Sequence, residues 1–157
     1  MKKYSFIKQK TMPSEEFVSL HDVNVSQIKK TKKGIRLICK DPFTVVRQGT
    51  AFCVFEGSVL YEGAENYDCE CYVFYGKATS EGEMLVGIPI DIRFLNRFLR
   101  DNKNTIEIYE EYYGYSGTLL KGNLRPYEEG LGVDWKHVII HIRVNSNIIY
   151  TGIMNAT

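Results

Sequence analysis

The sequence has no long apolar run and almost no net charge. Its 157 residues carry a formal net charge of +1, so no global field points to nucleic acid or to a membrane surface. Met1, Lys2 and Lys3 are not followed by the apolar stretch of a signal peptide, and no run approaches the ~20 residues that a membrane helix needs. These absences predict a cytoplasmic protein without a membrane partner.

Known catalytic motifs are missing as well. The chain contains no G-x-S-x-G, no P-loop and no G-x-G-x-x-G, and Gly130-Leu131-Gly132 is too short a glycine pattern to indicate a nucleotide site. The sequence therefore predicts no catalytic residue and no cofactor, and it favours a protein that is not an enzyme. An enzyme of unrecognised type is the weaker alternative.

What the sequence does contain is aromatic and β-branched residues in alternating patterns. Eleven tyrosines and eight phenylalanines favour strands over helices. The length fits one domain, and no repeat or linker divides it. Counting the alternating stretches gives about ten strands joined mostly by short connections, so we predict a single, mainly antiparallel β-barrel or two-sheet sandwich over 1–157. The last two strands, 133–144 and 148–154, are expected to form a hairpin.

One stretch has helical rather than alternating periodicity, and we expect the principal helix at about 91–101. Asp91 is placed to cap its first turn. The apolar positions Ile92, Leu95 and Leu99 recur at helical spacing, and Phe94 and Phe98 widen the apolar stripe. Arginines lie on the other side, so we expect one face to pack on the sheet and the other to be solvated.

The four cysteines raise the question of a metal site. Cys69 and Cys71 alternate with charged residues in a predicted strand, 66–76, and share its apolar face with Tyr67. A zinc site usually takes its paired thiolates from a turn, whereas cysteine in a strand packs as a small apolar residue. The sequence therefore predicts core cysteines, reduced in the cytosol, and no metal.

A histidine pair near the C-terminus has zinc-like spacing but lies in a predicted strand. His137 and His141 would be roughly 13 Å apart along a strand, too far for one ion. Trp135, His137, His141 and Arg143 are expected on the face opposite Val138, Ile140 and Ile142. This mixed face is either a solvated sheet surface, the more ordinary interpretation, or the lining of a small-ligand-binding barrel.

Two further segments are candidates for recognition. The lysine-rich tip at 29–33 has no interleaved aromatic residue for base stacking, so we interpret it as a solvated hairpin tip and regard a nucleic-acid partner as unsupported. The segment 109–117 combines tyrosine, serine and glycine with two glutamates, the chemistry of many protein-binding surfaces. The candidate binding residues in this segment are Tyr109, Glu111, Tyr112, Tyr113 and Tyr115.

Residues 17–46 carry a resemblance. The step Leu20-His21-Asp22, followed by a hairpin and then by Asp41-Pro42-Phe43-Thr44, resembles the opening of small, uncharacterised bacterial β-rich proteins, some of which are similar to immunity proteins of toxin systems. The resemblance implies a bacterial protein that binds another protein. The leading hypothesis is thus a non-enzymatic protein-binding domain, and the alternative is a small-ligand-binding β-barrel. The sequence indicates neither the partner nor the oligomeric state.

Overall fold

A computed structural model describes residues 2–9, 16–101, 103–114, 117–125, 135–143 and 147–154, apart from the side chains of residues 78, 83, 135 and 136. The chain begins with β1 (Lys2–Lys8), β2 (Glu16–Ser19), β3 (Asn24–Thr31), β4 (Gly34–Cys39), β5 (Phe43–Arg47) and β6 (Thr50–Glu62). A 3-10 turn, η1 (Asn66–Asp68), precedes β7 (Cys69–Thr79), β8 (Gly82–Ile90) and α1 (Ile92–Asp101). The chain continues with β9 (Thr105–Gly114), β10 (Gly117–Arg125), β11 (Trp135–Ile142) and β12 (Ile148–Met154).

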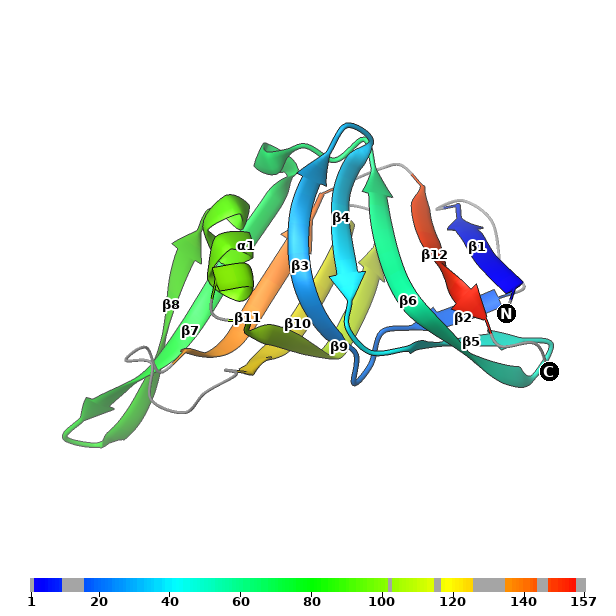
Figure 1. Cartoon of the computed structure of the whole chain (residues 1–157). Helices are drawn as coiled ribbons and strands as arrows, with labels where there is room; N and C mark the ends of the chain where they lie inside the picture. The colour runs from blue at the N-terminus through cyan, green and yellow to red at the C-terminus, as the bar shows by residue number, and fades with distance from the viewer. Residues whose placement is uncertain are drawn as a thin grey trace.

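The strands form one antiparallel sheet that curls on itself without closing (Figure 1). Its order is β1-β12-β6-β4-β3-β9-β10-β11-β7-β8, and β5 pairs with β6 and then with β2. The sheet thus has twelve strands, slightly more than the sequence indicated, and the mainly β prediction with one principal helix is confirmed for the described residues. The strands β1 and β8 are the two ends of this order.

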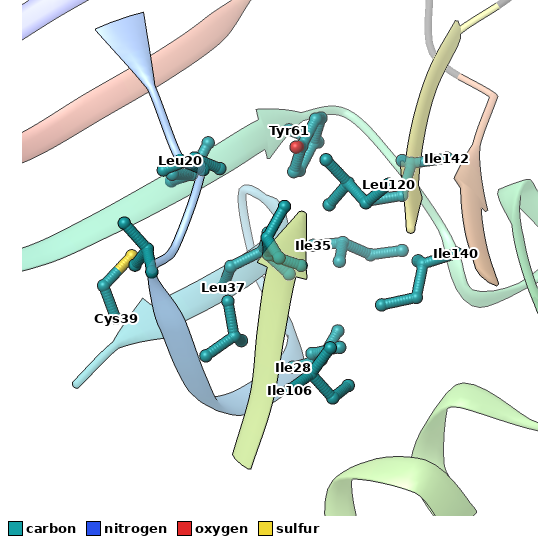
Figure 2. Close-up of a cluster of buried hydrophobic side chains, with 14 of the residues drawn as sticks. Leu20, Ile28, Ile35, Leu37, Cys39, Tyr61, Ile106, Leu120, Ile140 and Ile142 are labelled. Carbon is teal, nitrogen blue, oxygen red and sulfur yellow. The ribbon is translucent and has the colours of Figure 1, made fainter. Parts of the chain in front are cut away.

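The core lies inside the curl, where strands from its two walls face each other (Figure 2). Ile35 and Leu37 of β4 lie in one cluster with Ile106 of β9, Leu120 of β10 and Ile140 of β11, and each of these side chains is at most 1% exposed. Each fully buried leucine or isoleucine contributes about 1.5–3 kcal/mol relative to an exposed position. The largest aliphatic members are Leu20, Ile28, Ile35, Leu37, Leu95, Leu99, Ile106, Ile108 and Leu120.

The helix α1 packs between β3 and β7, where these strands are separated by β9, β10 and β11 in the sheet order (Figure 1). Asp91 caps it: the main-chain amide of Arg93 donates to Asp91 Oδ1 at 2.7 Å. Ile92, Leu95 and Leu99 are buried, as the periodicity predicted. Phe94 differs, because half of its surface is exposed.

The prediction of a C-terminal hairpin is wrong. The strand β11 pairs with β10 and β7, whereas β12 pairs with β6 and β1 on the opposite wall. Sequence proximity favours a hairpin, but the two strands lie in opposite walls of the curled sheet, where each has a neighbour on both of its backbone edges. Tyr150 of β12 is consequently buried between the two walls.

Candidate functional site

The tyrosine-rich segment lies on β9 and is divided between two faces of the sheet. The register between β9 and β10 shifts at this point, because Glu110 pairs with Lys121 while Ile108 pairs with Gly122, which leaves Tyr109 as the extra residue of a bulge. Beyond the bulge, Glu111 and Tyr113 point into the curl, and Glu110 and Tyr112 point outward. The predicted binding residues of this segment are therefore not one surface, and Tyr115 lies outside the described residues.

The inward pair belongs to a polar cluster at one end of the core. The carboxylate of Glu111 accepts hydrogen bonds from the main-chain amide of Leu20 and from the Tyr113 hydroxyl. The Tyr113 hydroxyl also lies 3.0 Å from that of Tyr150 in β12, and Lys8 Nζ lies 3.5 Å from the centre of the Tyr113 ring. This cluster joins β9 to the segment after β2, to β1 and to β12.

Burial sets the protonation of this cluster. Loss of hydration raises the pKa values of Tyr113 and Tyr150 above the usual tyrosine range, so both phenols stay protonated and donate hydrogen bonds. Burial lowers the pKa of Lys8, and the nearby Glu111 carboxylate opposes that shift. The arrangement stabilises a carboxylate inside the fold by hydrogen bonds and a nearby cation, which is a structural role.

The outward pair contributes to a charged surface strip. Lys121 Nζ lies 2.6 Å from Glu110 Oε2, and the Tyr112 hydroxyl donates to the same carboxylate oxygen at 3.1 Å. The Lys121 bond is the main cause of the lowered pKa of Glu110, and Glu110 in turn raises the pKa of Lys121. Tyr112 is about half exposed, at 51%. This part of the predicted surface is open to solvent, but its charges are already paired with each other.

His137, His141 and Arg143 lie on the outer face, as predicted. Val138, Ile140 and Ile142 are buried, whereas His137 and His141 are partly exposed and Arg143 is exposed. Trp135 begins β11 and pairs with Tyr75, but its side chain lies outside the described set. Neither His137 nor Arg143 faces the interior, where a ligand-binding barrel would need them.

The side chains on this outer face are bonded to their neighbours. His137 Nδ1 lies 2.9 Å from Asn123 Oδ1, and the His137 ring meets the Tyr109 ring edge-on with centres 6.3 Å apart. His141 Nδ1 lies 3.6 Å from Glu70 Oε2, and Arg143 forms an ion pair with the same glutamate. Because His137 and His141 have different partners, the face resembles an ordinary solvated sheet surface.

Three of the four cysteines lie in the core as predicted, and Cys53 does not. Cys69 and Cys71 are buried, with their sulfurs 3.8 Å apart, while Cys39 is buried and Cys53 is exposed. No group of three or more potential metal ligands occurs within the described ranges. Tyr67 is the exception to the predicted face, because η1 occupies 66–68 and leaves Tyr67 81% exposed.

A surface that the sequence did not single out lies on the β7–β8 hairpin. The hairpin extends beyond the rest of the sheet (Figure 1). Met84 and Leu85 are each 51% exposed, although neighbouring residues of a strand point to opposite faces. Both faces of the hairpin end are therefore open. Ile88 of the same hairpin is 40% exposed, and Phe94 of α1 is 50% exposed.

The same hairpin also has a free strand edge. The strand β8 pairs with β7 alone in the part of the chain that the structure describes. Proteins commonly protect such an edge with charges or with a short strand, yet β8 extends over nine residues and contains the run Leu85-Val86-Gly87-Ile88. Proline in a strand is typical of an edge, so Pro89 after this run is the sequence signal that β8 is an edge strand.

Comparisons with protein-family models, with curated proteins and with solved structures find no match to this chain. Among the described residues, no helix has the length and apolar character needed to cross a membrane. The geometry of the described surfaces is therefore the basis for a functional proposal.

Proposed function

We propose that this protein is a non-enzymatic binding module that recognises another polypeptide through the outer edge of β8. The observation that carries the proposal is the half-exposed, apolar β8 edge, with Met84 on one face and Leu85 on the other. An added strand would bond to the main chain of β8 and cover apolar side chains on both faces. This mode of recognition, strand addition, obtains affinity from the backbone and specificity from alternate side chains.

Two other features support a protein partner. Exposed apolar side chains gathered on one hairpin, here Met84, Leu85 and Ile88, are typical of interaction sites in folded proteins. The resemblance of residues 17–46 to bacterial proteins, some similar to immunity proteins, also implies binding to another protein. We propose the cytoplasm as the compartment, because the four cysteines are all free thiols in the structure.

The experiment replaces Leu85 by a photo-reactive phenylalanine analogue in the cells that make the protein. The matched control places the same analogue at Lys32, which is exposed at the distant β3–β4 tip. We expect a discrete protein adduct from position 85 and none from position 32. The captured species is then purified and must bind the wild-type protein but lose binding with Leu85→Lys. The absence of an adduct specific to position 85 contradicts the proposal.

A further inference from the structure

The free edge of β8 has a defined set of main-chain groups. Pro89 pairs with Tyr72 of β7 and has no N–H, so it fits only where the strand does not donate to β7. Hydrogen-bonded and non-bonded positions alternate along an antiparallel pair. Leu85 and Gly87 therefore share the orientation of Pro89, and their N–H and C=O groups point away from β7, toward an incoming strand.

The hairpin turn gives the same orientation independently. Thr79 and Gly82 pair across the turn, and Thr79 Oγ1 donates to the carbonyl oxygen of Gly82 at 2.7 Å. The residues that flank a two-residue hairpin loop form a hydrogen-bonded pair, so Gly82 bonds toward β7. By alternation, Leu85 then points outward.

We propose that the strand that binds β8 is the β8 of a second copy of this chain, antiparallel and related by a two-fold axis at Leu85. The inference rests on the proposed function, because it uses the same edge and names the partner. The two curled sheets would become one sheet that runs through both molecules. Such an interface is isologous, because the same edge of each copy forms it. Two-fold dimers are the commonest homo-oligomers.

The register follows from where Pro89 lies. With the axis at Leu85, the outward-pointing residue pairs are Leu85 with Leu85 and Gly87 with residue 83, and every member has an N–H to donate. With the axis at Gly87, Leu85 would face Pro89 twice, and each such pair would lose a hydrogen bond. The next pair along would also include Asp91, which already caps α1. An axis at Val86 would place Pro89 opposite residue 83, and an axis at Met84 would pair only residues 82–86 of β8 instead of 82–88. The axis at Leu85 is therefore favoured.

The side chains fit this register. Leu85 meets Leu85 of the second copy on one face, and Met84 meets Val86 on the other, so three half-exposed or partly exposed apolar residues are covered from both sides. Gly87 lies beneath the Phe74 ring, since a Cβ there would be 2.7 Å from a ring carbon. Because Gly87 has no side chain, the Phe74 ring covers this part of β8. No side chain at position 87 then obstructs the second copy.

The test compares two variants that each carry one new cysteine, Leu85→Cys and Met84→Cys. Both are made in a Cys53→Ser background, which removes the exposed thiol and leaves only buried ones. Directly paired residues lie ~5.5 Å apart at Cα, within the range that a disulfide spans. Two copies of residue 84 would be about 8 Å apart, beyond the ~7 Å limit, as judged from strand spacing and rise. Because Met84 and Leu85 are equally exposed, Met84→Cys is the matched control for Leu85→Cys.

We expect mild oxidation to link Leu85→Cys into a covalent dimer, at least ~10-fold faster than Met84→Cys, and light scattering to show a wild-type dimer at ~100 µM. Leu85→Lys places like charges at the axis, and its monomer should retain the wild-type circular dichroism spectrum. A monomeric wild type that forms no Leu85→Cys disulfide overturns the proposal, as does faster linkage at position 84 or a dimer that Leu85→Lys leaves intact.

The dimer experiments and the photo-crosslinking experiment distinguish the failure of this inference from the failure of the proposed function. If the photo-adduct at position 85 contains a different protein and the purified chain stays monomeric, β8 binds a polypeptide but not itself. If no adduct forms at position 85 with any chain, both proposals fail.

Discussion

Asn96 of α1 accepts a hydrogen bond from the main-chain amide of Ile28 in β3, with 3.1 Å between Asn96 Oδ1 and Ile28 N. The strand β3 pairs with β9 only at Asn24 and Val25, so further along β3 the helix supplies an acceptor where a neighbouring strand would normally do so. Ile28 is fully buried. A side chain of the helix thus replaces one hydrogen bond of the sheet at the place where the two walls of the curl separate.

Asn96→Ala should therefore destabilise the protein by about 1–3 kcal/mol, because it leaves a buried amide without an acceptor. Asn96→Asp keeps an acceptor oxygen and should cost less. Urea denaturation of both variants measures the difference. Equal stability of Asn96→Ala and wild type would show that water or another group replaces the bond.

The apolar face of α1 gives a second prediction. Leu95 has no solvent exposure, so Leu95→Ala should cost ~2–5 kcal/mol through lost burial and the remaining cavity. Arg97 is exposed on the opposite side, and Arg97→Ala should stay within ~0.5 kcal/mol. Thermal denaturation of this pair tests which face is packed, and a more damaging change at Arg97 would reverse the assignment.

The helix cap predicts a pH dependence. Hydrogen bonds from Arg93 hold the pKa of Asp91 at about 2, below its ordinary value of 3.8. A depressed folded-state pKa contributes stability that is fully present above ~4 and is lost as the pH falls toward ~2. Asp91→Ala should cost about 1 kcal/mol at pH 7. In urea titrations this difference should shrink between pH 4 and ~2, and a constant difference would contradict the assigned shift.

The hydrogen-bonded cluster around the partly buried Glu111 predicts energetic coupling between Glu111 and Tyr113. Removing the carboxylate in Glu111→Ala leaves the Leu20 amide and the Tyr113 hydroxyl without their acceptor, and we expect a loss of roughly 3 kcal/mol. Tyr113→Phe removes one donor and should cost about 1 kcal/mol. In a double-mutant cycle the two effects should differ from additivity by more than ~0.5 kcal/mol. Strict additivity would mean that the two side chains act separately.

Thiol accessibility gives the last prediction. Burial raises the pKa of Cys39 to about 12, so at neutral pH its thiol is neither ionised nor accessible. Cys69 and Cys71 are buried too, whereas Cys53 is exposed. Iodoacetamide should therefore label only Cys53 in the native protein and all four cysteines after denaturation. Mass spectrometry counts the labels, and rapid native labelling of Cys39 would show that this part of the core opens.

The sequence by itself determined the parts that depend on local periodicity. The 3.6-residue spacing of Ile92, Leu95 and Leu99 placed the helix and its buried face, since that spacing is a property of one element. Alternation from 137 to 143 likewise assigned the outer face of β11 correctly. Both patterns are fixed by the geometry of a single helix or strand, whatever its neighbours are.

The tertiary structure alone decided which strands are neighbours and which apolar residues stay uncovered. Nothing local to 109–113 reveals that a bulge against β10 turns Glu111 inward and Tyr112 outward. Nor does the apolar run 84–88 indicate by itself that β8 is the last strand of the sheet, because a central strand and an edge strand can have the same alternation. Strand order depends on pairing between distant segments, and that pairing is what leaves Met84 and Leu85 open to a partner.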